Sequence, residues 1–228
     1  MIDIKIIASG SRGNAYIIQD GKNRILIDPG ISINELIQKS GFLISKLDFC
    51  LISHEHKDHC KAAYHVSRFG VPLVMSAGTA EKLGLYGVKA VSEKPILDFE
   101  GWDILPFEVQ HDAAEPLGFM IRTPSGKRIV YASDTYYIQY NFPDIHYWMI
   151  EANYSEERLN ENDNLHPTHK DRVRTSHFEI QNLKNFFMAQ DLSSTEKIFL
   201  LHLSDDNSEE DNFKAEIQKV TGKPVYIS

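Results

Sequence analysis

The sequence has few cysteines and no long hydrophobic run. Its two cysteines, Cys50 and Cys60, do not belong to a CxxC pair, and two cysteines do not make a secreted disulfide scaffold. No apolar run approaches the roughly 20 residues that a membrane-spanning helix needs. The chain starts directly with Ile2-Asp3-Ile4-Lys5 and shows no signal-peptide pattern. We therefore expect a cytoplasmic protein that does not contact the membrane.

The chain also lacks a basic excess. It contains 24 Lys and Arg residues against 32 Asp and Glu residues, for a formal net charge of -8. Proteins that wrap nucleic acid without sequence preference usually carry the opposite sign, so this class is disfavoured. A nuclease is not excluded, because bound divalent ions would cancel much of the local negative charge.

Length and composition allow a complete catalytic domain. The 228 residues are 42% hydrophobic and include 12 Phe, 10 Tyr and 2 Trp, which can fill a sizeable core. We expect one domain over residues 1–228.

Short apolar segments separated by turn signals predict an α/β chain. Strands are expected at 2–8, 15–19, 24–28, 49–52, 71–75, 102–109, 117–122, 127–132, 147–152, 198–201 and 224–227. Helices are expected at 33–40, 61–69, 180–189 and 208–221. The polar stretch 160–176 is expected to be a surface loop or an active-site flap.

A cluster of metal-ligand side chains follows the expected strand 49–52. The pattern is His54-x-His56-x-Asp58-His59, with four potential ligands in six residues. His54 and His56 alternate along an extended chain, so both can face one metal. Asp58 and His59 come where the chain turns and can face a second. Imidazole and carboxylate groups suit zinc or a similar divalent ion, and such a concentration is rare in an ordinary polar loop.

More potential ligands follow at the ends of later strands. His111, Asp134 and His202 each come at or just after the C-terminal end of an apolar run. A sheet would therefore hold them at one edge. Asp28 also ends a strand, before Pro29-Gly30. It can either orient a metal-bound imidazole or serve as a simple turn residue, and the sequence weighs these two roles equally.

These motifs, in this order and over nearly the whole chain, resemble those of the metallo-β-lactamase superfamily. The resemblance implies a four-layer αββα sandwich with two divalent metal ions, zinc or manganese, at one edge. It implies that one ion is bound by His54, His56 and His111, the other by Asp58, His59 and His202, with Asp134 bridging. The signature specifies the fold better than the reaction, since hydrolases of thioesters, lactams, lactones and phosphodiesters share it.

Finer motifs narrow the resemblance to a branch. They are Ser9-Gly10-Ser11-Arg12-Gly13-Asn14, the segment 111–119 and His202-Leu203-Ser204-x-x-Asn207. Together they resemble the YycJ/WalJ-like branch of bacterial proteins regarded as DNA 5′-exonucleases, although Tyr136 stands where that branch usually has glycine. The amides of the glycine-rich loop can approach an anion closely, so Ser11 and Asn14 are expected substrate contacts.

The segment around His177 raises a second substrate-binding hypothesis. Ser176-x-x-Glu179 reads as a capping box, which would place His177 in the first turn of a helix, near free amides and positive dipole. Arg172 and Arg174 lie just upstream. The functional interpretation is a phosphate clamp that acts with Asp58 in catalysis; the alternative is an ordinary helix start with solvated basic residues.

The expected reaction is hydrolysis of a DNA phosphodiester. Two divalent ions about 3.5–4 Å apart would share a bridging hydroxide that attacks phosphorus in line with the leaving oxygen. A thioester or lactone hydrolase would use the same metals but lack an extended phosphate-binding groove. A non-catalytic binding protein would tolerate lost ligands, whereas all seven are present. No stable protein partner can be deduced.

Overall fold

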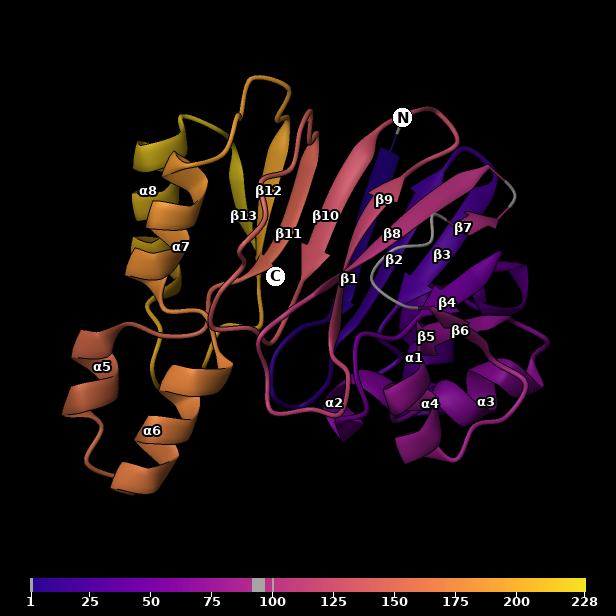
Figure 1. The fold of residues 1–228 in the computed structure, drawn as a ribbon, viewed down its shortest axis with the longest axis horizontal. Helices are drawn as coiled ribbons and strands as arrows, with labels where there is room; N and C mark the ends of the chain where they lie inside the picture. Colours follow the sequence, from indigo (N-terminus) through magenta and orange to yellow (C-terminus); the bar gives the residue numbers. More distant parts are fainter. Residues whose placement is uncertain (1, 92–96, 100) are drawn as a thin grey trace. The chain divides into compact units, whose positions relative to one another are not determined.

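A computed structural model describes residues 2–91, 97–99 and 101–228 (Figure 1). The chain divides into two compact units. The first consists of Met1–Glu108 and Ala113–Lys127, and the second of Val109–Asp112 and Arg128–Ser228. The expectation of a single domain over residues 1–228 stays a prediction.

The first unit is built on a sheet whose strands follow one another in chain order. Its strands are β1 (Ile2–Ala8), β2 (Ala15–Asp20), β3 (Asn23–Ile27), β4 (Phe49–Leu51), β5 (Leu73–Ser76) and β6 (Lys89–Val91). β1, β2 and β3 are antiparallel, whereas β3 to β6 run parallel. The change to parallel pairing places the ends of β3 and β4 at the same edge, since Ile27 lies opposite Leu51.

Helices connect the parallel strands of the first unit. They are α1 (Ile33–Ser40), the 3-10 turn η1 (Ile44–Lys46), α2 (Lys57–Cys60), α3 (Ala63–Arg68) and α4 (Ala77–Leu83). α1 begins where the Ser32 hydroxyl accepts a hydrogen bond from the Glu35 amide. It ends at Gly41, whose φ of 72° is the left-handed conformation that glycine adopts without strain.

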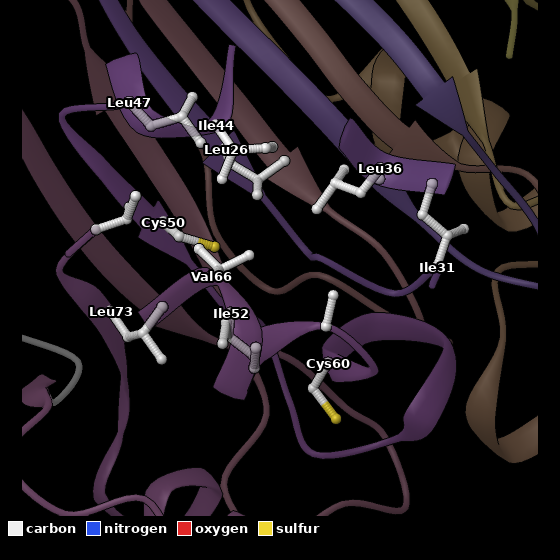
Figure 2. Close-up of a cluster of buried hydrophobic side chains, with 14 of the residues drawn as sticks. Leu26, Ile31, Leu36, Ile44, Leu47, Cys50, Ile52, Cys60, Val66 and Leu73 are labelled. Carbon is white, nitrogen blue, oxygen red and sulfur yellow. The ribbon is translucent and has the colours of Figure 1, made fainter. Parts of the chain in front are cut away.

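The core of the first unit lies between its sheet and these helices (Figure 2). Leu26 of β3, Cys50 of β4 and Leu73 of β5 point to this face and pack with Leu36 of α1 and Val66 of α3. Residues in a strand alternate between faces, so Phe49 points to the other side. Both faces of these strands are therefore apolar, and each face packs against other parts of the unit.

The opposite face of the sheet contacts an antiparallel meander. Its strands are β7 (Leu97–Phe99), β8 (Trp102–Glu108) and β9 (Leu117–Arg122). The Phe49 ring lies 6.3 Å from the Trp102 ring, edge to face, and 4.8 Å from that of Phe99. The Trp102 indole donates a hydrogen bond to Asp48 at 3.0 Å. The first unit is thus layered as helices, sheet and meander.

The second unit contains a parallel sheet with strands β10 (Arg128–Ala132), β11 (Tyr147–Glu151), β12 (Lys197–Leu201) and β13 (Val225–Ile227). Ala132 lies opposite Ile150, and Glu151 opposite Leu201. The carboxyl ends of β10, β11 and β12 therefore lie at one edge of this sheet.

The helices of the second unit are α5 (Glu156–Glu161), α6 (Pro167–Ser176), α7 (Ile180–Met188) and α8 (Glu210–Thr221). Figure 1 shows α7 and α8 beside β12 and β13. The Trp148 ring of β11 packs edge-on against Phe186 and Phe187 of α7. Lys184 of α7 forms an ion pair with Glu216 of α8 at 2.8 Å. These contacts fix α7 on the sheet.

The strands and the four helices expected from periodicity are confirmed, with bounds shifted by a few residues. The expectation of a loop or flap at 160–176 is wrong for most of this stretch, because α5 extends to Glu161 and α6 begins at Pro167. His166 caps this helix and Pro167 occupies its first turn, a start signal that outweighs the weak apolar periodicity. No helix in the described part of the chain is both long and apolar enough to cross a membrane.

Candidate metal centre

In the first unit, Asp28 organises the ends of β3 and β4. Its carboxylate accepts hydrogen bonds from the amide and the hydroxyl of Ser53, both at 2.8 Å. Its own amide bonds the Leu51 carbonyl. Asp28 is fully buried and has a φ of 52°, an uncommon conformation outside glycine. The loop after β4 is therefore fastened to the end of β3 by a buried carboxylate.

The same carboxylate orients an imidazole of the His54 to His59 motif. Asp28 Oδ2 lies 2.8 Å from His59 Nδ1, and both side chains are fully buried. Since an ionised carboxylate only accepts, Nδ1 carries the proton and Nε2 is the atom suited to a metal. Of the two roles that the sequence left open for Asp28, the geometry favours the orienting one.

The remaining ligands of this motif lie close to His59. The His54 ring centroid is 4.7 Å from that of His56 and 4.2 Å from that of His59. His54 Nδ1 lies 3.0 Å from the Ser53 hydroxyl, which itself donates to Asp28. Asp58, in the first turn of α2, has a carboxylate oxygen 3.6 Å from His59 Nε2. The motif thus gathers three imidazoles and a carboxylate as predicted.

Close backbone packing holds Asp58 in place. The Asn14 amide donates to the Asp58 carbonyl at 2.7 Å. A Cβ at Gly30 would lie 1.7 Å from the same oxygen, so only glycine fits.

Asn14, an expected substrate contact, lies inside the turn. Its side chain is fully buried, bonds Gly10 and Tyr16, and lies 3.0 Å from His59 Nε2. The Gly10 and Gly13 amides are bonded within the same loop, so neither is available to an anion. The tight turn thus packs against the metal motif, and its Asn14 side chain contacts the same His59 nitrogen that suits a metal. Ser11 is exposed at the tip of the turn.

In the second unit, three polar residues lie at the shared edge of the parallel sheet. Asp134 comes two residues after β10, Glu151 ends β11 and His202 follows β12. All three are nearly or fully buried. Asp134 and His202 have φ values of 50° and 51°, the left-handed conformation already seen at Asp28. The strand ends thus bring together two predicted ligands and one residue that sequence reasoning missed.

Glu151 is that missed residue. One of its oxygens lies 2.6 Å from His177 Nδ1 and 3.0 Å from His202 Nδ1, while the other accepts from the Thr135 and Phe178 amides. The sequence did contain a signal for Glu151. It is a charged residue at the end of the apolar strand 147–151, just as Asp134 and His202 come at the ends of theirs. Glu151 fixes His202 as Asp28 fixes His59.

Charge at Glu151 and His177 is mutually stabilised. Burial alone would raise the pKa of the Glu151 carboxyl, but the His177 charge and the hydrogen bonds from both imidazoles bring it below its ordinary value. Burial opposes charge on His177, yet the Glu151 carboxylate raises the pKa of that imidazole above its ordinary value. Each group of this pair therefore favours the charged form of the other.

His111 is held in a similar way within the second unit. Its Nδ1 lies 3.0 Å from the Ser176 carbonyl, which can only accept, so Nδ1 donates. Nε2 lies 3.7 Å from an Asp134 oxygen and 3.4 Å from Asp112. Burial lowers the pKa of His111, and Asp134 offsets this only in part. A neutral imidazole with a fixed Nδ1 proton is the form that binds metals.

The expected helix start at His177 is wrong. His177 follows the last residue of α6 in an extended conformation, and the next helix is capped by Glu179, whose side chain accepts from the Asn182 amide. Ser176 instead belongs to α6 and bonds Asp112 at 3.3 Å. His177 is therefore held by Glu151 rather than by a helix N-terminus, and its ring stacks on that of His202 at 5.4 Å.

Both arginines predicted to bind substrate lie on α6 and contact carboxylates. Arg172 donates to Asp112 at 2.9 Å and is 58% exposed. Arg174 pairs with Glu156 and Asp171, and the Glu156 bond raises the pKa of its guanidinium. Arg174 thus ties α6 to α5, whereas Arg172 lies beside the residue that follows His111.

The donors present fit divalent metal ions. The first unit contributes His54, His56, Asp58 and His59, and the second contributes His111, Asp134 and His202. Within the second unit, atoms of Asp134, Glu151, His177 and His202 all lie within 4.8 Å of one another. Since Glu151 serves both histidine Nδ1 atoms, it suits the role of hydrogen-bond acceptor better than that of ligand. Imidazole and carboxylate donors with fixed Nδ1 protons are typical of zinc or manganese sites.

The chain is similar in sequence to known exodeoxyribonucleases. The chain is 29% identical to the exodeoxyribonuclease WalJ of Streptococcus pneumoniae, over 89% of this chain and 82% of the relative. It is 24% identical to the exodeoxyribonuclease YycJ of Bacillus anthracis, over 96% of this chain and 89% of the relative.

A solved structure shows the same fold. The metallo-β-lactamase fold protein YhfI of Bacillus subtilis matches with a TM-score of 0.78 at 18% identity, over 100% of this chain and 95% of the other. The predicted fold class, an α/β fold with two sheets and helices, is thereby confirmed. Residues 23–198 match the beta-lactamase superfamily domain, and the chain therefore belongs to that superfamily as a metallo-hydrolase.

Proposed function

We propose that this protein is a dinuclear metal-dependent phosphodiesterase that degrades DNA as an exonuclease. The observation that carries the proposal is the likeness to two exodeoxyribonucleases over most of the chain. The retained imidazole and carboxylate donors support it, because a non-catalytic descendant would have no need to keep them. A cytoplasmic location remains a prediction.

The ligand sets that we propose are those implied by the family. His54, His56 and His111 would hold one ion, Asp58, His59 and His202 the other, and Asp134 both. Zinc or manganese bound there supplies a water of lowered pKa and stabilises developing charge. Asp28 and Glu151 keep two of these imidazoles in the tautomer that presents Nε2.

We assign His177 to the substrate phosphate or its leaving oxygen. Glu151 occupies its Nδ1 at 2.6 Å, and the side chain is 20% exposed, so Nε2 can donate to an anion. Arg172 and Ser11, both exposed, are proposed as further substrate contacts. Asp58 acts in catalysis as a metal ligand.

The test uses purified protein loaded with zinc or manganese. End-labelled single- and double-stranded DNA are offered beside a thioester and a lactone. We expect DNA cleavage that a chelator abolishes, two ions per chain by elemental analysis, and loss of cleavage in His54→Ala and Asp134→Ala. The exposed histidine of α3 provides the control, since His65→Ala should retain full activity. Thioester or lactone turnover without DNA cleavage would identify a small-molecule hydrolase instead.

A further inference from the structure

One pocket of the second unit contains none of the proposed metal ligands. It has a volume of about 380 Å³ and lies between α7 and the segment 137–141 that follows Asp134. Pockets that bind small ligands begin at about 300 Å³, so the space is sufficient for one small planar group. Ten residues line it, and none of the ten carries a charge.

Aromatic rings form part of its wall. Tyr137 and Tyr140 come from the segment after Asp134, and Phe186 from α7. Tyr137 is 54% exposed, whereas Phe186 is buried and packs on Trp148. Tyr137 therefore offers an accessible ring in a pocket whose other wall includes the fixed ring of Phe186. Such rings are the surfaces on which nucleobases stack.

Carboxamides make up half of the lining. They are Gln139, Asn141, Asn182, Asn185 and Gln190. Each carries both a donor and an acceptor, the combination that reads the edges of bases. Asn182 and Asn185 stand three residues apart on α7, so they lie on one face of the helix.

Hydrogen bonds hold the wall of this pocket together. Gln190 accepts from the Phe142 amide at 3.0 Å and donates to Asn141 at 3.0 Å and to the Tyr140 carbonyl at 3.2 Å. One side chain thus fastens segment 137–141 to the end of α7. The pocket is a preformed feature, which lowers the entropic cost of binding.

The pocket is also joined to the metal-ligand edge of the same unit. The Thr135 hydroxyl donates to the Tyr137 carbonyl at 2.8 Å, and the Thr135 amide donates to Glu151 at 2.9 Å. Thr135 directly follows the ligand Asp134. Thr135 thus links the pocket wall at Tyr137 to Glu151, which bonds His177 and His202.

We propose that this pocket binds the base of a nucleotide next to the cleaved phosphodiester, by stacking on Tyr137 and by hydrogen bonds from Asn182 and Asn185. A neutral lining of rings and carboxamides suits an uncharged heterocycle and offers no counter-charge to a phosphate or a charged peptide side chain. The proposal rests on the proposed function for its substrate. It implies an unpaired base, since a base in a duplex has its edge and faces occupied.

The first experiment measures binding without turnover. Saturation-transfer NMR of the metal-loaded protein is run with deoxyadenosine 5′-monophosphate and, as the base-free control, 2-deoxyribose 5-phosphate. We expect saturation of the base protons in the first ligand and affinity lowered at least about fivefold in Tyr137→Ala, as loss of one stacking surface predicts. Tyr137→Phe should retain binding. Tyr86→Ala removes a fully exposed tyrosine of the first unit and should change nothing.

The second experiment measures cleavage. Single-stranded oligonucleotides ending in a normal nucleotide or in an abasic tetrahydrofuran residue are compared. The wild type should prefer the normal end through a lower KM, and Tyr137→Ala and Asn185→Ala should lose this preference while kcat stays unchanged.

The outcomes separate the pocket from the function. Base binding that depends on Tyr137 in a protein without nuclease activity would support the pocket and overturn the proposed function. Two results would overturn the proposal of base binding and leave the proposed function standing. One is nuclease activity with no preference for a terminal base, and the other is equal binding of deoxyadenosine 5′-monophosphate and 2-deoxyribose 5-phosphate.

Discussion

A single oxygen of Glu151 lies 2.6 Å from His177 Nδ1 and 3.0 Å from His202 Nδ1. One buried carboxylate thus positions both a proposed metal ligand and the side chain proposed to contact the phosphate. Because the two imidazoles share one acceptor, a change at Glu151 acts on metal affinity and on turnover together.

Replacing Glu151 with glutamine tests this shared role. The amide preserves size but removes the charge and presents a donor toward a backbone amide or an imidazole. We expect metal affinity to fall by about 10–100-fold and activity to fall at saturating metal as well. Isothermal titration with zinc and turnover should be measured on one preparation, with the exposed-position variant Glu157→Gln as control. A glutamine variant that matches wild type in both quantities would contradict the assignment.

His177→Ala should separate metal binding from catalysis. We expect the metal stoichiometry to stay near wild type and the melting temperature to fall, because buried Glu151 loses a partner. We expect kcat per folded molecule to fall by about 100-fold or more, since a positioned donor to the reacting group is lost. Metal analysis, thermal unfolding and turnover are compared. Retained metal with unchanged turnover would show that the residue is only structural; lost metal would show that it supports a ligand.

Asp28→Ala should weaken the metal site of the first unit. Without the carboxylate, His59 loses the acceptor that fixes its tautomer, and the Ser53 amide and hydroxyl lose their partner. We expect about 10–100-fold weaker metal binding and lower stability. Zinc titration against a competing chelator measures the first effect and urea unfolding the second. Asp163→Ala, at an exposed position, is the control; equal zinc affinity in both variants would refute the orienting role.

Asp20 should make the stability of the fold depend on acid pH. Its carboxylate accepts from the Ser125 amide at 2.6 Å. Burial opposes the charge, yet the hydrogen bonds from Ser125 and Thr123 lower the pKa of Asp20 below its ordinary value. This stabilisation is present above the unfolded pKa of about 3.9 and is lost as pH falls through the folded value. Asp20→Asn should cost about 1–2 kcal/mol in urea unfolding at pH 7, and this cost should decline progressively as the pH is lowered below about 3.9. If the difference in unfolding free energy between variant and wild type did not change with pH, Asp20 would not be the source of the acid dependence.

Gly30→Ala should disrupt the loop that carries Asp58. The new methyl group would collide with the Asp58 carbonyl, 1.7 Å from its ideal position, and backbone cannot yield as a side chain can. We expect a loss of several kcal/mol or failure to fold, together with reduced metal content. Gly70→Ala separates collision from conformational strain: its φ is 80° and nothing lies within 4 Å, so about 1–2 kcal/mol is expected. Equal losses of stability in Gly30→Ala and Gly70→Ala would refute the proposed collision with the Asp58 carbonyl.

The ligand residues were predictable because their chemistry is local to the sequence. His54, His56, Asp58 and His59 stand within six positions, and Asp134 and His202 follow apolar strands that periodicity identifies. Parallel pairing then brings Asp134 and His202 to one edge without further information.

The partners of these ligands were harder to predict. Glu151 stands 26 residues from His177 and 51 from His202, so its role appears only when β11 lies between β10 and β12. The helix at Pro167–Ser176 was missed because polar residues cover most of it and its apolar periodicity is weak. Because of that error, the start of the next helix was predicted at Ser176 instead of Glu179. His177 was therefore predicted to lie at a helix start, whereas Glu151 holds it.

Asp28, Asp134 and His202 share a left-handed backbone conformation at the ends of their strands. Each such residue other than glycine costs about 1–2 kcal/mol, which asparagine or aspartate bears most easily and histidine less so. The fold thus stores conformational energy at three positions where its chemistry is concentrated. At Asp134 and His202, glycine would relieve this strain but remove a proposed metal ligand, so stability and catalytic capacity compete at these two positions. At Asp28 the hydrogen bonds to Ser53 and His59 offset the strain, so the same residue serves both.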